Sequence, residues 1–129
     1  MNLMVCFDGS TASHHALYFA KKRANLLGAK ILVVTSMGSG HDIAADCERA
    51  EKLLEKVKTE IQHEQIACET HLSVRDLPAG ENLARIAMTR SIDEIYIGVK
   101  NRSKVGKLIH GSTAHYLILN SPCPVVTVR

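Results

Sequence analysis

Aromatic residues are scarce in this sequence of 129 residues, which has no tryptophan, two phenylalanines and three tyrosines. Proteins that bind single-stranded nucleic acid stack its bases on aromatic side chains, so we expect no nucleic-acid partner. Apolar runs are also short. None approaches the roughly 20 residues of a membrane helix, and the amino terminus has no basic segment followed by an apolar one. We therefore expect no membrane partner and a cytoplasmic location.

Motifs of metal, redox and hydrolytic chemistry are missing too. The cysteines, Cys6, Cys47, Cys68 and Cys123, are too far apart for a zinc clip or a redox pair. In a chain without a secretion signal they are expected to be reduced and mostly buried. The seven histidines include no HExxH pair, so no metal site is predicted. No Ser-His-Asp order and no paired carboxylate set converges on the basic segment before Gly111, where Asp8 is the only nearby acid, so no catalytic residue is predicted.

Acidic residues are absent from 95–129, although the whole chain has 13 of them against 16 lysines and arginines. The cations in this segment are Lys100, Arg102, Lys104, Lys107 and Arg129. Such a basic segment indicates either an anion site or a solvated surface. The overall composition, 46% hydrophobic and 22% charged, is that of a globular protein, and the length suits one domain over 1–129.

Apolar segments alternate with segments of helical periodicity along the chain. The apolar segments, which we expect to be strands, are 2–7, 30–35, 66–74, 94–99 and 125–128. Helices are expected between them, the first capped by Ser10 or Thr11 and ended by Gly28. Regular alternation with short connections predicts an α/β fold, a doubly wound parallel sheet with helices on both faces.

Two of these segments carry a prediction about which side chains are buried. In 66–74, apolar and polar residues alternate with a period of two, which predicts a half-exposed strand at a sheet edge. Val74 belongs to its apolar row and Ser73 to its polar row. In the last helix, Ala114, Leu117 and Ile118 are expected to face inward.

Two segments at predicted strand ends are candidates for a ligand site, because ligands of doubly wound sheets bind at the carboxyl ends of strands. Asp8-Gly9-Ser10 follows the first strand. Gly98 ends the fourth, before the basic segment and Gly111-Ser112-Thr113 at a helix start. A helix N-terminus offers unpaired N–H groups and a partial positive charge. The pattern predicts a phosphate site; the alternatives are a simple turn at Asp8 and close helix packing at Gly111.

The spacing of the second segment resembles the nucleotide signature of the universal stress protein family: Gly, two residues, Gly, nine residues, then Gly-Ser or Gly-Thr. Gly98 opens the signature here, residues 102–110 fill the long gap, and Gly111-Ser112 closes it. Asp8-Gly9-Ser10 and the C-terminal 121–128 are also similar to the family. The resemblance therefore covers almost the whole chain.

The resemblance implies a Rossmann-like three-layer sandwich with strand order 3-2-1-4-5 and a site for an adenine nucleotide between strands one and four. The residues that it implies at the nucleotide are Asp8, Ser36, Gly98, Asn101, Gly111, Ser112 and Thr113. Ser36 would line the adenine pocket, where the family often has valine. Asn101 stands where the signature has its second glycine. Asparagine tolerates a positive φ, and its side chain would either crowd the phosphates or donate to them.

The function that the resemblance implies is an ATP-binding module for stress response or signalling, with or without Mg²⁺. Hydrolysis would at most be slow, because it needs a metal and a positioned water. The alternative is a dimeric interaction protein that uses no nucleotide. The last strand, 125–128, is apolar and lies at a sheet edge in the family order, which predicts a homodimer formed through it.

Overall fold

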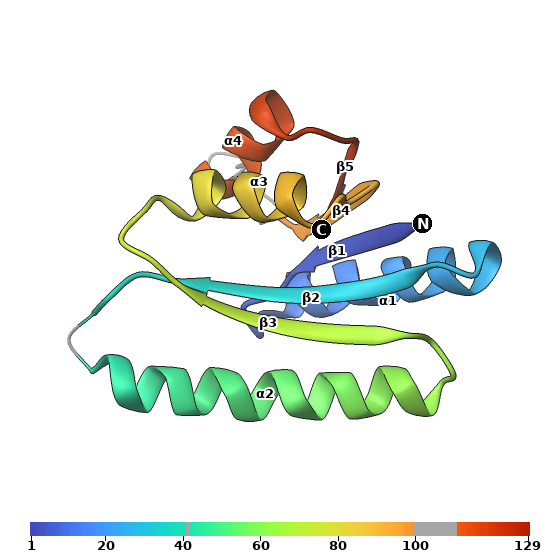
Figure 1. The fold of residues 1–129 in the computed structure, drawn as a ribbon, viewed down its shortest axis with the longest axis horizontal. Helices are drawn as coiled ribbons and strands as arrows, with labels where there is room; N and C mark the ends of the chain where they lie inside the picture. Colours follow the sequence, from blue (N-terminus) through green and yellow to red (C-terminus); the bar gives the residue numbers. More distant parts are fainter. Residues whose placement is uncertain (41, 100–110) are drawn as a thin grey trace.

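The computed structural model describes residues 1–40, 42–99 and 111–129 of the chain. Strands and helices alternate throughout these residues (Figure 1). In chain order they are β1 (Asn2–Cys6), α1 (Thr11–Leu27), β2 (Lys30–Met37), α2 (Ile43–His63), β3 (Cys68–Val74), α3 (Ala79–Thr89), β4 (Glu94–Gly98), α4 (Ser112–Asn120) and β5 (Val125–Val128). The predicted α/β alternation is thus confirmed.

The strands form one five-stranded parallel sheet in the order β3-β2-β1-β4-β5, as expected. β1 is central: its Val5 is in register with Val33 of β2 and with Tyr96 of β4. The chain first moves outward from β1 to β2 and β3, then returns to the other side for β4 and β5. The strand order therefore reverses between β1 and β4, where doubly wound sheets bind ligands.

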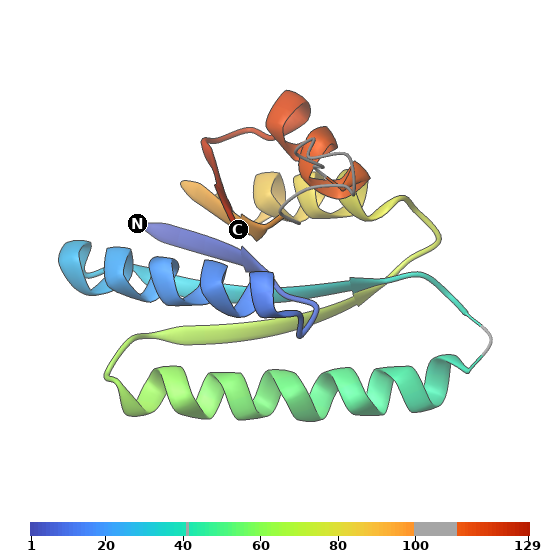
Figure 2. The same cartoon turned by 180° about the vertical axis from the view of Figure 1, so that it is seen from behind.

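Helices cover both faces of the sheet, α1 and α2 on one face and α3 and α4 on the other (Figures 1 and 2). The side chains of β1 alternate between the two resulting cores. Leu3 and Val5 belong to the core under α1 and α2, whereas Met4 and Cys6 belong to the core under α3 and α4. A strand buried on both faces needs a continuous apolar run, which explains its sequence.

The ends of α1 have the local signals that the sequence predicts. The Ser13 amide donates to Ser10 Oγ at 3.2 Å, so Ser10 caps the first turn. Gly28 ends the helix in the left-handed conformation with a φ of 65°, and its amide donates to the Ala24 carbonyl. Because only four residues separate the end of β1 from the start of α1, the first turn of α1 lies at the carboxyl edge of the sheet.

Two burial predictions are wrong. Ser73 of the predicted polar row is buried, and Val74 of the apolar row is 40% exposed. β3 does lie at the sheet edge, but its polar row faces α3, where Asn82 donates to Ser73 Oγ at 2.9 Å. Ile118 is 47% exposed although Ala114 and Leu117 are buried. α4 covers the sheet only near its β5 edge, so its buried stripe is too narrow to include Ile118.

No helix in the described part of the chain combines the length and apolar character needed to cross a membrane.

Candidate functional site

A pocket of about 630 Å³ lies where the strand order reverses. That volume is within the range of small-ligand pockets, roughly 300–1,000 Å³. It is surrounded by the carboxyl ends of β1, β2 and β4 and by the first turns of α1, α3 and α4. Its lining residues are Cys6, Phe7, Asp8, Ser10, Thr11, Ala12, Ser13, Val34, Ser36, Ala79, Leu83, Ile97, Gly98, Val99, Gly111, Thr113 and Ala114.

Three helix N-termini face this pocket, which makes its rim rich in backbone N–H groups. The first amides of α1 are partly satisfied by the Ser10 cap. α3 starts after Pro78 and α4 after Gly111, and no side chain of the described residues caps either start. Uncapped N–H groups together with the positive ends of the helix dipoles favour a negatively charged ligand.

Close packing explains why residue 98, which lines the pocket, is a glycine. A Cβ at this position would lie 2.4 Å from the Ala12 carbonyl carbon and 2.6 Å from its oxygen. Real Cβ atoms do not come so close to backbone, so only glycine lets the end of β4 lie against the first turn of α1. The glycine thus has a role within the chain itself and brings two walls of the pocket together.

Gly111 has the opposite surroundings. A Cβ there would meet no described atom within 4 Å, and its φ of −57° is one that any residue adopts. The alternative of close helix packing at Gly111 therefore finds no contact among the described residues. Space that no described atom occupies, beside the uncapped start of α4, is what the approach of a ligand to the backbone requires.

Asp8 forms a turn at the end of β1 and also lines the pocket. Its Oδ1 accepts the Ser10 amide at 2.9 Å. Burial by itself would raise the pKa of Asp8, but hydrogen bonds from Ser10 and Ser13 outweigh it and hold the pKa below its usual value. The carboxylate is therefore ionised at neutral pH and acts only as an acceptor.

The structure brings some of the predicted site residues together and separates others. Asp8, Ser36, Gly98, Gly111 and Thr113 line the same pocket. Ser112 begins α4 and is exposed, but it is not among the lining residues. Asn101 and the cations Lys100, Arg102, Lys104 and Lys107 lie outside the described residues.

A polar cluster beneath the pocket was not predicted. Asn82 of α3 is fully buried and donates from Nδ2 to Ser36 Oγ at 3.0 Å and to Ser73 Oγ at 2.9 Å. Its Oδ1 accepts from Arg85 Nη2 at 3.0 Å. The sequence does contain a signal for Asn82: it lies four residues before the buried Ile86, so it is a polar residue on the apolar face of its helix.

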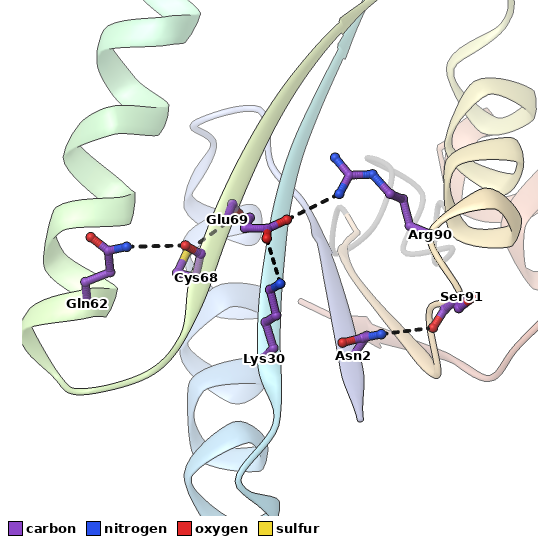
Figure 3. Close-up of polar contacts among 7 residues, drawn as sticks. All are labelled: Asn2, Lys30, Gln62, Cys68, Glu69, Arg90 and Ser91. Carbon is purple, nitrogen blue, oxygen red and sulfur yellow. Dashed lines mark hydrogen bonds and ion pairs between the residues drawn. The ribbon is translucent and has the colours of Figure 1, made fainter.

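The opposite edge of the sheet, at the amino ends of the strands, has a hollow of only about 60 Å³. Figure 3 shows Glu69 there between Lys30 and Arg90, with carboxylate-to-nitrogen distances of 2.6 and 3.3 Å. Nearby, Asn2 Nδ2 donates to the Ser91 carbonyl at 3.3 Å. These groups already pair with one another, so this hollow offers a ligand little unsatisfied charge.

Acidic ligands for a metal are few around the large pocket. Asp8 is the one acidic side chain among its described lining residues. Nowhere in the ranges 1–40, 42–99 and 111–129 do three His, Cys, Asp or Glu side chains form a group that could hold a metal ion.

The chain is similar to known proteins along its whole length. The model of the Universal stress protein family matches residues 1–129. A universal stress protein from Thermus aquaticus, named for its place in the QAH/OAS sulfhydrylase 3′ region, is 28% identical over an alignment of 134 positions, which covers 98% of this chain and 97% of that protein.

Solved structures agree with this match. A universal stress protein from Archaeoglobus fulgidus has a TM-score of 0.89 and 32% identity, covering 100% of this chain and 98% of its own. The universal stress protein from Archaeoglobus fulgidus in complex with dAMP has a TM-score of 0.83 and 27% identity, with coverage of 100% and 98%.

Proposed function

This chain belongs to the universal stress protein family, and we propose that it binds an adenine nucleotide in the pocket above β1, β2 and β4, as a binding module for stress response or signalling. The observation that carries the proposal is the pocket itself: about 630 Å³ of space at the reversal of strand order, bounded by three helix N-termini. A relative of the same fold is known in complex with dAMP, which supports an adenine nucleotide as the ligand.

The phosphates belong at the start of α4 in this proposal. Gly111 leaves room for a phosphate to reach the backbone, and the amides of the first turn of α4 are free of side-chain caps within the described residues. Thr113 adds a hydroxyl to the same wall. We further propose that Asn101 and Ser112 contribute to the phosphate end, as the spacing of the family signature implies.

The nucleoside belongs at the β2 side of the pocket. Val34, Ala79 and Leu83 supply apolar contacts there for a flat base. Asp8, an ionised acceptor at the end of β1, suits a donor on the ligand such as a ribose hydroxyl or an exocyclic amine. An anionic side chain fits that role better than contact with a phosphate, which it would repel.

ATP is the proposed ligand because the helix N-termini can accept more charge than one phosphate carries. With Asp8 as the acidic residue among the described lining, Mg²⁺ would be held mainly by phosphate oxygens and water. The described lining offers no side-chain pair suited to activate a water. We therefore propose a binding protein whose hydrolysis of ATP is at most slow.

Calorimetric titration of the purified protein with AMP, ADP and ATP, each with and without Mg²⁺, tests the proposal. We expect saturable binding with one site per chain, tighter for the longer phosphate chains. Gly111→Val is the matched variant: its side chain would project into the space at the start of α4 that no described atom occupies, so binding should be lost while the fold remains. No binding by the wild type at millimolar ATP would overturn the proposal. Unchanged binding by Gly111→Val would move the phosphates elsewhere.

We also propose that two copies of the chain pair through β5. The strand is at one edge of the sheet, and Val126 is 36% exposed on it. The neighbouring helix exposes Ile118 and Leu119 at 47% and 68%. An apolar edge strand beside exposed aliphatic side chains favours association with a second copy. β3, at the other edge, has charged Glu69 and is less suited to pairing.

A reducing compartment, the cytoplasm, is the proposed location. All the cysteines, Cys6, Cys47, Cys68 and Cys123, are unpaired. Free thiols are the ordinary state where glutathione keeps cysteines reduced.

A further inference from the structure

Asn82 uses its whole amide group in hydrogen bonds although no part of it is exposed. Its Nδ2 donates to two serine hydroxyls, Ser36 on β2 and Ser73 on β3, at 3.0 and 2.9 Å. These serines are register partners on neighbouring strands. The third partner, Arg85, lies one turn further along α3 and approaches Asn82 Oδ1 at 3.0 Å.

Arg85 determines which way the Asn82 amide points. A guanidinium can only donate, so the Asn82 atom beside it must be the oxygen. The two amide hydrogens then point to Ser36 and Ser73, whose Oγ atoms act as acceptors. Each serine proton is consequently free to point away from Asn82. The positive charge of Arg85 also polarises the amide, which strengthens the next bond in the chain.

The two serines differ in where their free proton can go. Ser36 lines the pocket, whereas Ser73 is 5% exposed and does not line it. Among the described residues, the only hydrogen bond of the Ser36 hydroxyl is the one that it accepts from Asn82. Ser36 therefore presents a hydrogen-bond donor to whatever occupies the pocket.

Ser36 is on the nucleoside side of the pocket rather than the phosphate side. It belongs to β2, which is separated from β4 by β1, so the ends of β2 and β4 are about 10 Å apart. Its neighbours in the lining, Val34 and Leu83, are apolar. A single oriented donor among apolar walls is the arrangement with which pockets select one base over another.

We propose that Ser36 selects the base by donating its hydroxyl proton to an unprotonated ring nitrogen of adenine, and that Asn82, oriented by Arg85, is the positioning residue for this proton. The inference rests on the proposed function, because it assumes that a nucleotide occupies the pocket. It adds a specificity contact that depends on Ser36 of β2 and on Asn82 and Arg85 of α3.

Ser36→Ala and Ser73→Ala form a matched pair for the test. Both remove one acceptor of the same Asn82 amide, but only Ser36→Ala removes the donor from the pocket. Titration with AMP should show about a tenfold loss of affinity for Ser36→Ala, the value of one hydrogen bond. The affinity of Ser73→Ala should remain within about twofold of the wild type. Equal losses in both variants would reduce Ser36 to a structural role and overturn the inference.

Base analogues identify the contact itself. The 1-deaza, 3-deaza and 7-deaza forms of AMP each replace one ring nitrogen by C–H. One of the three should bind the wild type about tenfold more weakly than AMP, and that difference should disappear in Ser36→Ala. If every analogue loses the same affinity in both proteins, Ser36 donates to no ring nitrogen and the inference fails.

Asn82→Asp tests the positioning role with almost no change of shape. The new carboxylate can still pair with Arg85, but it would accept the protons of both serines and withdraw the Ser36 proton from the pocket. We expect the affinity of Asn82→Asp for AMP to fall as far as that of Ser36→Ala, and the discrimination among the deaza analogues to be lost. Retained discrimination would contradict the role of Asn82. Failure of the wild type to bind both AMP and ATP would instead reject the proposed function.

Discussion

A Cβ added to Gly98 would lie 2.4 Å from the carbonyl carbon of Ala12 and 2.7 Å from its Cβ, so the end of β4 can touch the first turn of α1 only because residue 98 has no side chain. Both residues line the large pocket. The contact fixes how far the α1 N-terminus is from the end of β4, which sets the width of the pocket between them. Gly98 therefore shapes the site by being small, in addition to any contact with a ligand.

Gly98→Ala should destabilise the protein, because the neighbour that must move is backbone. Overpacking of this kind costs about 1–3 kcal/mol. The matched control is Gly111→Ala. It meets no described atom, and the lower entropy of its unfolded chain roughly offsets the poorer helix cap, so its stability should change by less than about 0.5 kcal/mol. Urea unfolding of both variants measures the difference. Equal stability of the two would show that the Gly98 contact relaxes easily.

The elements themselves could be predicted because their signals are local. The apolar run of β1 is continuous because both faces of that strand are buried, and Gly28 ends α1 because its φ of 65° favours glycine. The order of the strands in the sheet, in contrast, could not be predicted from local signals. Pairing between distant strands leaves no periodicity in the chain, so the position of β4 beside β1 followed from the family resemblance alone.

The burial of individual side chains was harder to predict, because it depends on which other element packs against each helix or strand. Helical spacing places Ile118 near Ala114 but does not say how wide a stripe the sheet edge can bury. The alternation of residues correctly separated the two faces of β3. It did not predict that Ser73 is buried, because that burial depends on Asn82, which hydrogen-bonds to Ser73 from α3. Asn82 also hydrogen-bonds to Ser36. The sequence near Ser36 therefore could not predict that its hydroxyl is oriented as a donor toward the pocket.

Thr113→Ala should weaken nucleotide binding more than Ser112→Ala. Thr113 lines the pocket, whereas Ser112 is exposed and does not. The loss of one hydrogen bond predicts a cost of about 1 kcal/mol for Thr113→Ala, more if the partner is a charged phosphate oxygen. Titration of both variants with ATP and Mg²⁺ is the measurement. The reverse order would mean that the start of α4 turns differently when ligand binds.

Val126→Lys should convert the proposed dimer into a monomer, since a charge on an edge strand prevents pairing. Val74→Lys is a closely matched control: Val74 is 40% exposed on the opposite edge strand, against 36% for Val126. It should leave the dimer intact. Light scattering at micromolar concentration distinguishes the masses. A monomeric wild type, or a Val74→Lys variant that dissociates while Val126→Lys does not, would rule out β5 as the interface.

Cys6 and Cys68 should resist thiol reagents until the protein unfolds. Both are buried, and burial raises the pKa of Cys6 to about 12 and that of Cys68 to about 11. A thiol must ionise to react, so at pH 8 little thiolate is present. Burial also raises the pKa of Cys123, which is only half-buried. Labelling followed by mass spectrometry should therefore find Cys123 modified before Cys6. Native-state labelling of Cys6 at the rate of the unfolded chain would contradict the assignment of these thiols as structural.

Asp8 should contribute stability that depends on pH. The hydrogen bonds from Ser10 and Ser13 favour its charged form and keep its folded-state pKa below the unfolded value, despite burial. A lowered pKa means that the contribution is fully present above the unfolded pKa of about 4 and is lost as the pH falls through the folded pKa. Because the side chain is only partly buried and solvent screens its charge, this contribution to stability should be no more than about 1 kcal/mol.

Asp8→Asn keeps the shape of the side chain but removes its titration, so it isolates this effect from all other carboxylates. In urea unfolding, the wild type should be the more stable protein at pH 7, and the two curves should converge as the pH is lowered below about 4. The contributions of the remaining acidic residues cancel in the difference, because both proteins contain them. A gap between the proteins that stays constant down to pH 2 would show that the lost energy comes from hydrogen-bond geometry rather than from the Asp8 charge.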